Sequence, residues 1–252
     1  MSGHSKWSTI KHKKARIDEK RGKEYTKIAK EITIAARAGG GDPESNAKLK
    51  LVIQKAKAVN MPNDNISRAI KKGTGELESD ALEEFLYEGY APGGVAVILE
   101  IATDNRNRTA SDIRHLFSKY GGNLGESGCV GWMFDRCGLI AVEREKLTGD
   151  VDEFMLQAIE YGAQDVRDDD EAILEVVCAV EDFMAVKEAL EQEVELAEAD
   201  LSYMPQNEVA ITDEELAMKI LRLIDALEDH DDVQNVYANF NIDDDLMDRI
   251  QG

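Results

Sequence analysis

The sequence predicts an α+β protein with an N-terminal three-helix lobe followed by two α/β domains, one of them a ferredoxin-like βαββαβ unit inserted in the other. Two observations carry this prediction. Apolar residues recur at helical spacing over residues 1–75, whereas strand and helix patterns alternate after them. Charge divides at the same point, because residues 1–75 hold 18 Lys and Arg against 7 Asp and Glu, and the remainder holds 12 against 44.

The lobe, residues 1–75, is predicted to contain three helices. The first spans residues 16–38, where apolar residues at steps of three and four form one face and cations form the opposite face. The glycines at 39–41 end it, because glycine adopts the left-handed conformation that closes a helix. The second helix is expected to open at Asp42-Pro43, as N-cap and first-turn proline. The third is expected over residues 62–73.

Residues 76–135 and 206–252 are predicted to form one discontinuous middle domain. Two strands and a polar loop lead to a helix with Thr109 or Ser111 as its N-cap. After residue 205 the pattern is strand, helix, strand, and such a piece cannot close a sheet alone, so we expect it to pair with the first segment. The expected strands are 85–90, 95–103, 209–211 and 233–240, and the last helix includes residues 216–227.

Residues 136–205 are predicted to form the inserted domain. Period-two apolar runs alternate with helical patterns in the order βαββαβ, which is that of the ferredoxin-like unit. The expected strands are 139–142, 163–166, 172–180 and 197–203, and the expected helices are 152–161 and 183–192.

Composition excludes several classes of protein. No apolar run approaches the roughly 18 residues of a membrane span, and the first residues lack the apolar core of a secretory signal. The three cysteines, Cys129, Cys137 and Cys178, are an odd number without C-x-x-C spacing, which favours reduced thiols over disulfides or a zinc site. We therefore expect a cytoplasmic protein.

Enzyme motifs are absent from the sequence. The glycine-rich stretch 121–128 lacks the lysine of a phosphate-binding P-loop, and the four histidines have no zinc-type spacing. The acidic clusters 168–171 and 243–245 lack the calcium-loop glycine and are predicted to be solvated loops. We expect no catalytic residue, metal, cofactor, membrane contact or small-molecule substrate.

The basic lobe predicts a nucleic-acid partner, since a polyanion is attracted to it and repelled by the rest of the chain. A merely solvated lysine face is the alternative. Trp7 is expected either to stack on an unpaired base or to anchor the tail. The predicted binding residues are Lys6, Trp7, Lys11, His12, Lys13, Lys14, Arg16, Lys20, Arg21, Lys23, Lys27, Lys30, Arg37 and Lys55.

Arg106 and Arg108 are predicted to form a second anion contact, because they stand before a helix N-terminus whose dipole favours negative charge. A local salt bridge to neighbouring carboxylates is the alternative for this pair.

The opening GHSKWSTIKHKK, residues 3–14, resembles the start of the YebC family. The segments TDNRNRT at 103–109 and YMP at 203–205 extend the resemblance, in order, along the entire chain. It implies a helical N-terminal lobe with two α/β domains and no cofactor or catalytic residue. Bacterial members of the family are described as cytosolic DNA-binding transcriptional regulators. Mitochondrial relatives are translational activators of cytochrome oxidase subunit I, and the family is linked to relief of stalled ribosomes.

Two functions remain open from the sequence. A DNA-binding transcriptional regulator fits the basic face, although no recognition helix with base-reading side chains is evident. A ribosome-bound translation factor that grips ribosomal RNA fits the tail and the acidic body equally well. A metal-dependent nuclease is disfavoured, because no carboxylate constellation for it is present.

Overall fold

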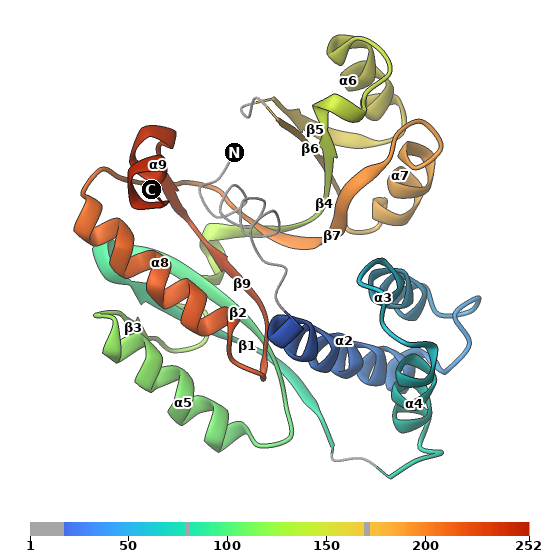
Figure 1. The fold of residues 1–252 in the computed structure, drawn as a ribbon, viewed down its shortest axis with the longest axis horizontal. Helices are drawn as coiled ribbons and strands as arrows, with labels where there is room; N and C mark the ends of the chain where they lie inside the picture. Colours follow the sequence, from blue (N-terminus) through green and yellow to red (C-terminus); the bar gives the residue numbers. More distant parts are fainter. Residues whose placement is uncertain (1–17, 79–80, 169–171, 252) are drawn as a thin grey trace. The chain divides into compact units, whose positions relative to one another are not determined.

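The computed structural model describes residues 18–78, 81–168 and 172–251 (Figure 1). Their fold confirms the predicted α+β class, with an N-terminal helical region followed by antiparallel sheets. The chain divides into two compact units. Among the described residues, the first unit comprises those within 18–129 and 213–236, and the second comprises those within 130–212 and 237–251. Within the described ranges, no helix is both long and apolar enough to cross a membrane.

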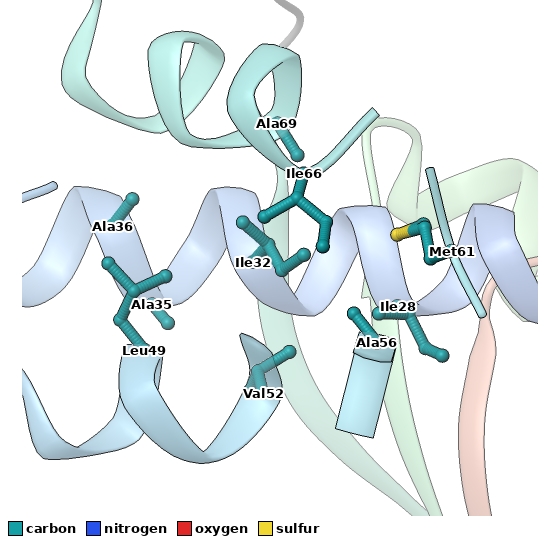
Figure 2. Close-up of a cluster of buried hydrophobic side chains, with 10 residues drawn as sticks. All are labelled: Ile28, Ile32, Ala35, Ala36, Leu49, Val52, Ala56, Met61, Ile66 and Ala69. Carbon is teal, nitrogen blue, oxygen red and sulfur yellow. The ribbon is translucent and has the colours of Figure 1, made fainter. Parts of the chain in front are cut away.

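Three helices form the N-terminal lobe of the first unit: α2 (Asp18–Gly39), α3 (Ala47–Ala58) and α4 (Asn63–Thr74). The apolar face predicted for the first helix is the centre of their core, and Ile32 and Leu49 are fully buried in it. Figure 2 shows side chains from all three helices meeting there. The cluster comprises Ile28, Ile32, Ala35, Ala36, Leu49, Val52, Ala56, Met61, Ile66 and Ala69.

The second helix begins later than predicted. Its N-cap is Asn46 and not Asp42, whose backbone oxygen instead closes a turn by accepting from the Ser45 N–H at 3.2 Å. The Asn46 side chain accepts from the Leu49 N–H at 3.0 Å and donates to the Ala35 and Gly40 carbonyls at 2.8 and 2.9 Å. One buried amide therefore caps α3 and satisfies carbonyls at the end of α2, which Asp42 cannot do because a carboxylate has no donor.

Replacement of two glycines in the lobe by alanine is expected to change stability in opposite directions. A Cβ at Gly73 would lie 2.4 Å from the Thr33 carbonyl oxygen, so α4 approaches the backbone of α2 there. Gly22 lies in α2 with nothing near its would-be Cβ. We expect Gly73→Ala to destabilise the protein by about 1–3 kcal/mol through overpacking, and Gly22→Ala to stabilise it by up to about 1 kcal/mol. Urea unfolding of both variants measures this, and equal shifts would contradict close packing at Gly73.

The sheet of the first unit has the strand order β3-β1-β2-β9. Its strands are β1 (Glu83–Ala91), β2 (Val95–Thr103), β3 (Asn123–Leu124) and β9 (Val233–Ala238). The short 3₁₀ turn Pro92–Gly94 joins β1 to β2, which pair antiparallel over nine residues each. Helices α5 (Arg106–Lys119) and α8 (Glu214–Glu228) pack side by side (Figure 1). The strand near the C-terminus thus lies beside β2, about 130 residues earlier in the chain.

Helix α5 begins before both predicted caps. Asn105 is its N-cap and accepts from the Arg108 N–H at 3.1 Å. Thr109, one of the two predicted caps, is fully buried and bonds to side chains beneath the helix. Arg106 and Arg108 therefore lie in the first turn of the helix and not before it.

The predicted strand 233–240 is interrupted at Asn239. Its amide donates to the Asn207 carbonyl at 3.2 Å, and its own carbonyl accepts from the Val209 N–H at 2.7 Å. A separate strand, β10 (Phe240–Ile242), then pairs in parallel with β8 (Val209–Ile211). The acidic segment 243–245, expected to be a solvated loop, instead begins a helix, α9 (Asp244–Gln251), with the Asp243 carboxylate accepting from the Leu246 N–H.

In the second unit, residues 134–205 form β4 (Phe134–Glu143), α6 (Val151–Glu160), β5 (Ala163–Arg167), β6 (Ile173–Cys178), α7 (Phe183–Leu190) and β7 (Leu196–Pro205). The strand order β5-β6-β4-β7, with every neighbouring pair antiparallel, is the ferredoxin-like arrangement. Helix α6 packs on β5, and α7 packs on β4 and β7. Short 3₁₀ turns at Gly131–Met133 and Arg144–Lys146 flank β4.

Candidate nucleic-acid interface

The structure describes only part of the predicted binding surface. The tail residues Lys6, Trp7, Lys11, His12, Lys13, Lys14 and Arg16 lie outside the described residues. Lys20 and Arg21 fall in the first turns of α2, and their side chains are likewise outside the description. The predicted residues whose side chains are described are Lys23, Lys27, Lys30 and Arg37 on α2, and Lys55 on α3.

Three lysines of the α2 face contact the C-terminal end of α8 and the segment that follows it. Lys23 donates to the Asp229 carbonyl at 3.2 Å, Lys27 to the Glu228 carbonyl at 2.5 Å and Lys30 to the Asp231 carbonyl at 2.8 Å. The last carbonyls of a helix have no partners within it and carry the negative end of the helix dipole, so ammonium groups are favourable there. The stripe therefore lies opposite the apolar face, as predicted, but these three lysines bind residues 228–232 of their own chain, and only Lys23 among them is exposed.

Asp232 is the centre of the contact. It is 4% exposed, and its carboxylate accepts from Lys30 at 2.7 Å, Thr109 at 2.7 Å and Arg108 at 3.1 Å. Burial alone would raise the pKa of Asp232, but the hydrogen bonds from Lys30, Thr109 and Arg108 outweigh it and hold this pKa well below its ordinary value. Asp232 is thus a permanent anion that joins the lobe to the strand end of β2 and the start of α5.

The two remaining described cations of the predicted surface are also engaged. Arg37 donates to the Leu82 carbonyl at 2.9 Å, and Lys55 forms an ion pair with Glu31 at 3.3 Å. Arg37 is exposed and Lys55 is half-buried. Both can still present charge to a polyanion, since neither contact is closed to water.

Arg106 and Arg108 make different contacts. Arg108 forms ion pairs with Asp104 at 2.8 Å and Asp232 at 3.1 Å, which is the local salt bridge considered as the alternative. Arg106 lies over the Phe85 ring, with its guanidinium carbon 4.5 Å from the ring centre. An anion approaching Arg108 would have to compete with two carboxylates.

A cleft of about 1040 Å³ runs between the lobe and the rest of the first unit. Helices α2 and α4 supply Lys23, Tyr25, Arg68 and Lys72 to one wall. The opposite wall carries Asp104, Asp112, Asp229, Asp231 and Asp232, with Arg108 and His230 between them. Arg68 and Lys72 were not among the predicted site residues. The signal that could have identified them is their four-residue spacing, which places Asn65, Arg68 and Lys72 along one side of α4.

The cleft is lined by charged side chains of both signs. Within them, no three His, Cys, Asp or Glu side chains are grouped to hold a metal ion. The walls instead present ammonium and guanidinium donors on one side and carboxylate acceptors on the other. A ligand in the cleft would therefore meet cationic donors from α2 and α4 and carboxylates from the opposite side.

The helical lobe, the antiparallel sheets and the charge-lined cleft together define a multidomain α+β protein with a basic helical N-terminal module. The family model described as the TACO1/YebC protein N-terminal domain matches residues 5–76, and the model of the TACO1/YebC second and third domain matches residues 82–240. The chain belongs to the TACO1/YebC family, which confirms the resemblance in its motifs.

Close relatives support the assignment over the full length. A probable transcriptional regulatory protein of Syntrophomonas wolfei is 66% identical over 249 residues, which cover 98% of this chain and 99% of the relative. One of Moorella thermoacetica is 60% identical over 252 residues, with 99% of each chain covered. The crystal structure of a conserved hypothetical protein from Aquifex aeolicus matches with a TM-score of 0.83 at 48% identity, over 91% of this chain and 93% of that one.

Proposed function

We propose that this chain is a nucleic-acid-binding regulator of gene expression that acts by binding and not by turnover. The observation that carries the proposal is the charge division, with a net charge of +11 in residues 1–75 and −32 in the rest. Phosphate contacts dominate affinity for nucleic acid, so only the lobe is suited to make them. The relatives named probable transcriptional regulatory proteins favour DNA as the target and transcription as the process.

In this proposal the basic lobe and the two acidic parts of the chain have different roles. Residues 1–75 bind nucleic acid, whereas residues 76–135 with 206–252, and the inserted unit 136–205, present acidic surfaces that keep the polyanion on the lobe. The free thiols of Cys129, Cys137 and Cys178 suit the reducing cytoplasm.

Ribosomal RNA is the second candidate target. It is favoured by the acidic wall of the cleft, which would repel a duplex with phosphates on both strands but can face the bases of an unpaired strand. The protein would then act on translation at the ribosome.

Sequencing of nucleic acid cross-linked to the protein in cells tests the proposal and separates the targets. Promoter DNA above a matched input identifies a transcriptional regulator, and defined positions of ribosomal RNA identify the translation factor. A variant with its tail lysines replaced by glutamine is the control, because true contacts should be depleted in it. Recovery of neither nucleic acid above that control would contradict the proposed function.

A further inference from the structure

Helix α5 is basic, although it belongs to the acidic part of the chain. Residues 76–252 hold 12 Lys and Arg against 44 Asp and Glu, and four of those cations but only one of those acids lie within the 14 residues of α5. Among the described α-helices after residue 76, no other has more cations than acids. The net charge that assigns phosphate contacts to the lobe therefore does not reveal this one basic surface outside it.

The outer face of α5 consists of five exposed polar side chains. These are Ser111, Arg114, His115, Ser118 and Lys119. At about 100° per residue they point away from the buried side of the helix, which packs towards β1 and β3. Ser111, His115 and Ser118 follow the middle of this face, and Arg114 and Lys119 flank them on its two sides. The outer face thus carries cations and hydrogen-bond donors and no carboxylate of its own helix.

The other charged side chains of α5 lie apart from this face. Arg108 is bonded to two carboxylates, and Arg106 lies over an aromatic ring. Asp112, the one acid of the helix, lines the cleft and lies 3.6 Å from the Nε2 atom of His230. The second anion contact expected at Arg106 and Arg108 is therefore better placed on the outer face, further along the same helix.

The chemistry of the outer face matches a phosphate backbone. Arginine and lysine bind phosphate oxygens as charged donors, and serine hydroxyls donate to the same oxygens. Arg114 and Lys119 are five residues apart, about 7.5 Å along the helix axis, which corresponds to about two phosphate steps of roughly 3.4 Å along one strand of a duplex. The ammonium group of Lys119 lies 5.2 Å from the centre of the Tyr120 ring, a contact that leaves its positive charge unneutralised.

We propose that the outer face of α5 binds the phosphate backbone of the nucleic acid held by the lobe, as a second contact that does not read base sequence. The inference rests on the proposed function and adds a site outside residues 1–75. The described part of the lobe and α5 belong to the same compact unit. A backbone bound at both places would be fixed in direction, because phosphate contacts set register and orientation.

Fluorescence anisotropy of the full chain with a labelled DNA duplex of about 20 base pairs and a single-stranded RNA of about 20 nucleotides tests this face. Arg114→Gln with Lys119→Gln removes two phosphate contacts, at salt slopes of roughly 0.9 each on duplex and 0.7 each on a single strand. Near 0.1 M salt we expect a loss of about 60-fold for the duplex or about 25-fold for the RNA. The probe whose affinity falls identifies which backbone the face binds.

Lys219→Gln with Arg222→Gln is the matched control. Both side chains are exposed on α8, which packs beside α5 and carries four acids with its two cations. The control removes the same charge from the neighbouring helix, so long-range attraction is reduced to a similar extent in both variants. We expect its loss of affinity to stay under about 3-fold, because charges beyond a Debye length of about 10 Å are screened at 0.1 M salt.

Ser111→Glu tests the outer face without removing a cation. Glutamate has a higher helix propensity than serine, and at this position it stands four residues before His115, so the melting temperature should not fall. Affinity should nevertheless fall by about 5-fold or more at low salt, because the new carboxylate would repel the bound phosphates. Thermal unfolding and anisotropy on the same variant measure both effects.

The outcomes separate this inference from the proposed function. A wild-type chain that bound neither probe would contradict the function itself. If the chain bound nucleic acid, unchanged affinity for both probes after the Arg114 and Lys119 replacements, or an equal loss in the α8 control, would overturn the outer face as a contact while leaving the function intact. Wild-type affinity in Ser111→Glu would overturn it as well.

Discussion

Replacing Asp232 by alanine is expected to lower the free energy of unfolding by about 3–5 kcal/mol, because removal of one partner leaves a buried charge without compensation. Lys30, whose side chain is 17% exposed, would lose its carboxylate partner at 2.7 Å. The hydroxyls of Thr103 and Thr109 would lose an acceptor in the same buried site. Urea unfolding followed by circular dichroism gives the measurement.

Asp231→Ala is the matched control for this change. Asp231 is exposed and adjacent, so removal of its side chain should alter stability by less than about 0.5 kcal/mol. Similar losses for the two variants would show that Asp232 contributes no more than an ordinary surface carboxylate.

The pH dependence of the free energy of unfolding gives a second test of the role of Asp232. Its pKa is lowered on folding, so its stabilising contribution is present above the pKa of the unfolded carboxyl, about 3.9, and is lost as pH falls below that value. The difference in stability between wild type and Asp232→Asn should therefore be constant from neutral pH down to about pH 5 and should shrink in stronger acid. A difference that grew with acidification would contradict the lowered pKa.

Replacing the four tail lysines, Lys6, Lys11, Lys13 and Lys14, by glutamine is expected to weaken duplex DNA binding by about three orders of magnitude near 0.1 M salt. Each lysine that contacts a phosphate releases counterions, so the slope of log affinity against log salt should fall by roughly 0.9 per lysine. Titrations at several salt concentrations measure both quantities.

A variant with Lys48, Lys50, Lys57 and Lys71 replaced by glutamine is the control, since it removes the same charge from α3 and α4. Its loss of duplex affinity should be far smaller than that of the tail variant. Equal losses would mean that total charge, and not the tail, determines binding.

Much of the fold could be predicted because its signals are local. The apolar face of α2 and the βαββαβ order of residues 134–205 follow from residue spacing within each element. The starts of α3 and α5 were predicted wrongly because each has more than one candidate N-cap residue within a few positions. Asp42-Pro43 is a strong local signal for a helix start, yet Asn46 prevails because its amide also bonds to the end of α2. Likewise, Asn105 caps α5 because the hydroxyl of Thr109 is buried against Asp232.

The site was harder to predict because its partners are distant in the sequence. Helical periodicity places Lys23, Lys27 and Lys30 on one face, but it carries no information about what lies opposite them. That face meets residues 228–232, about two hundred positions later. Arg68 and Lys72 line the same cleft, and a charge count of the lobe cannot distinguish them from its other cations.

The separation between Lys30 and Asp232 has a consequence for synthesis of the chain. Lys30 precedes its carboxylate partner by 202 residues, so at translation rates of 5–20 residues per second it leaves the peptidyl transferase centre roughly 10–40 s earlier. During that interval the carbonyls and carboxylate of residues 228–232 do not yet exist, and β2 lacks its neighbour β9. The lysines of the newly made lobe must therefore stay hydrated until the last tenth of the chain is made, and the first unit can close only then.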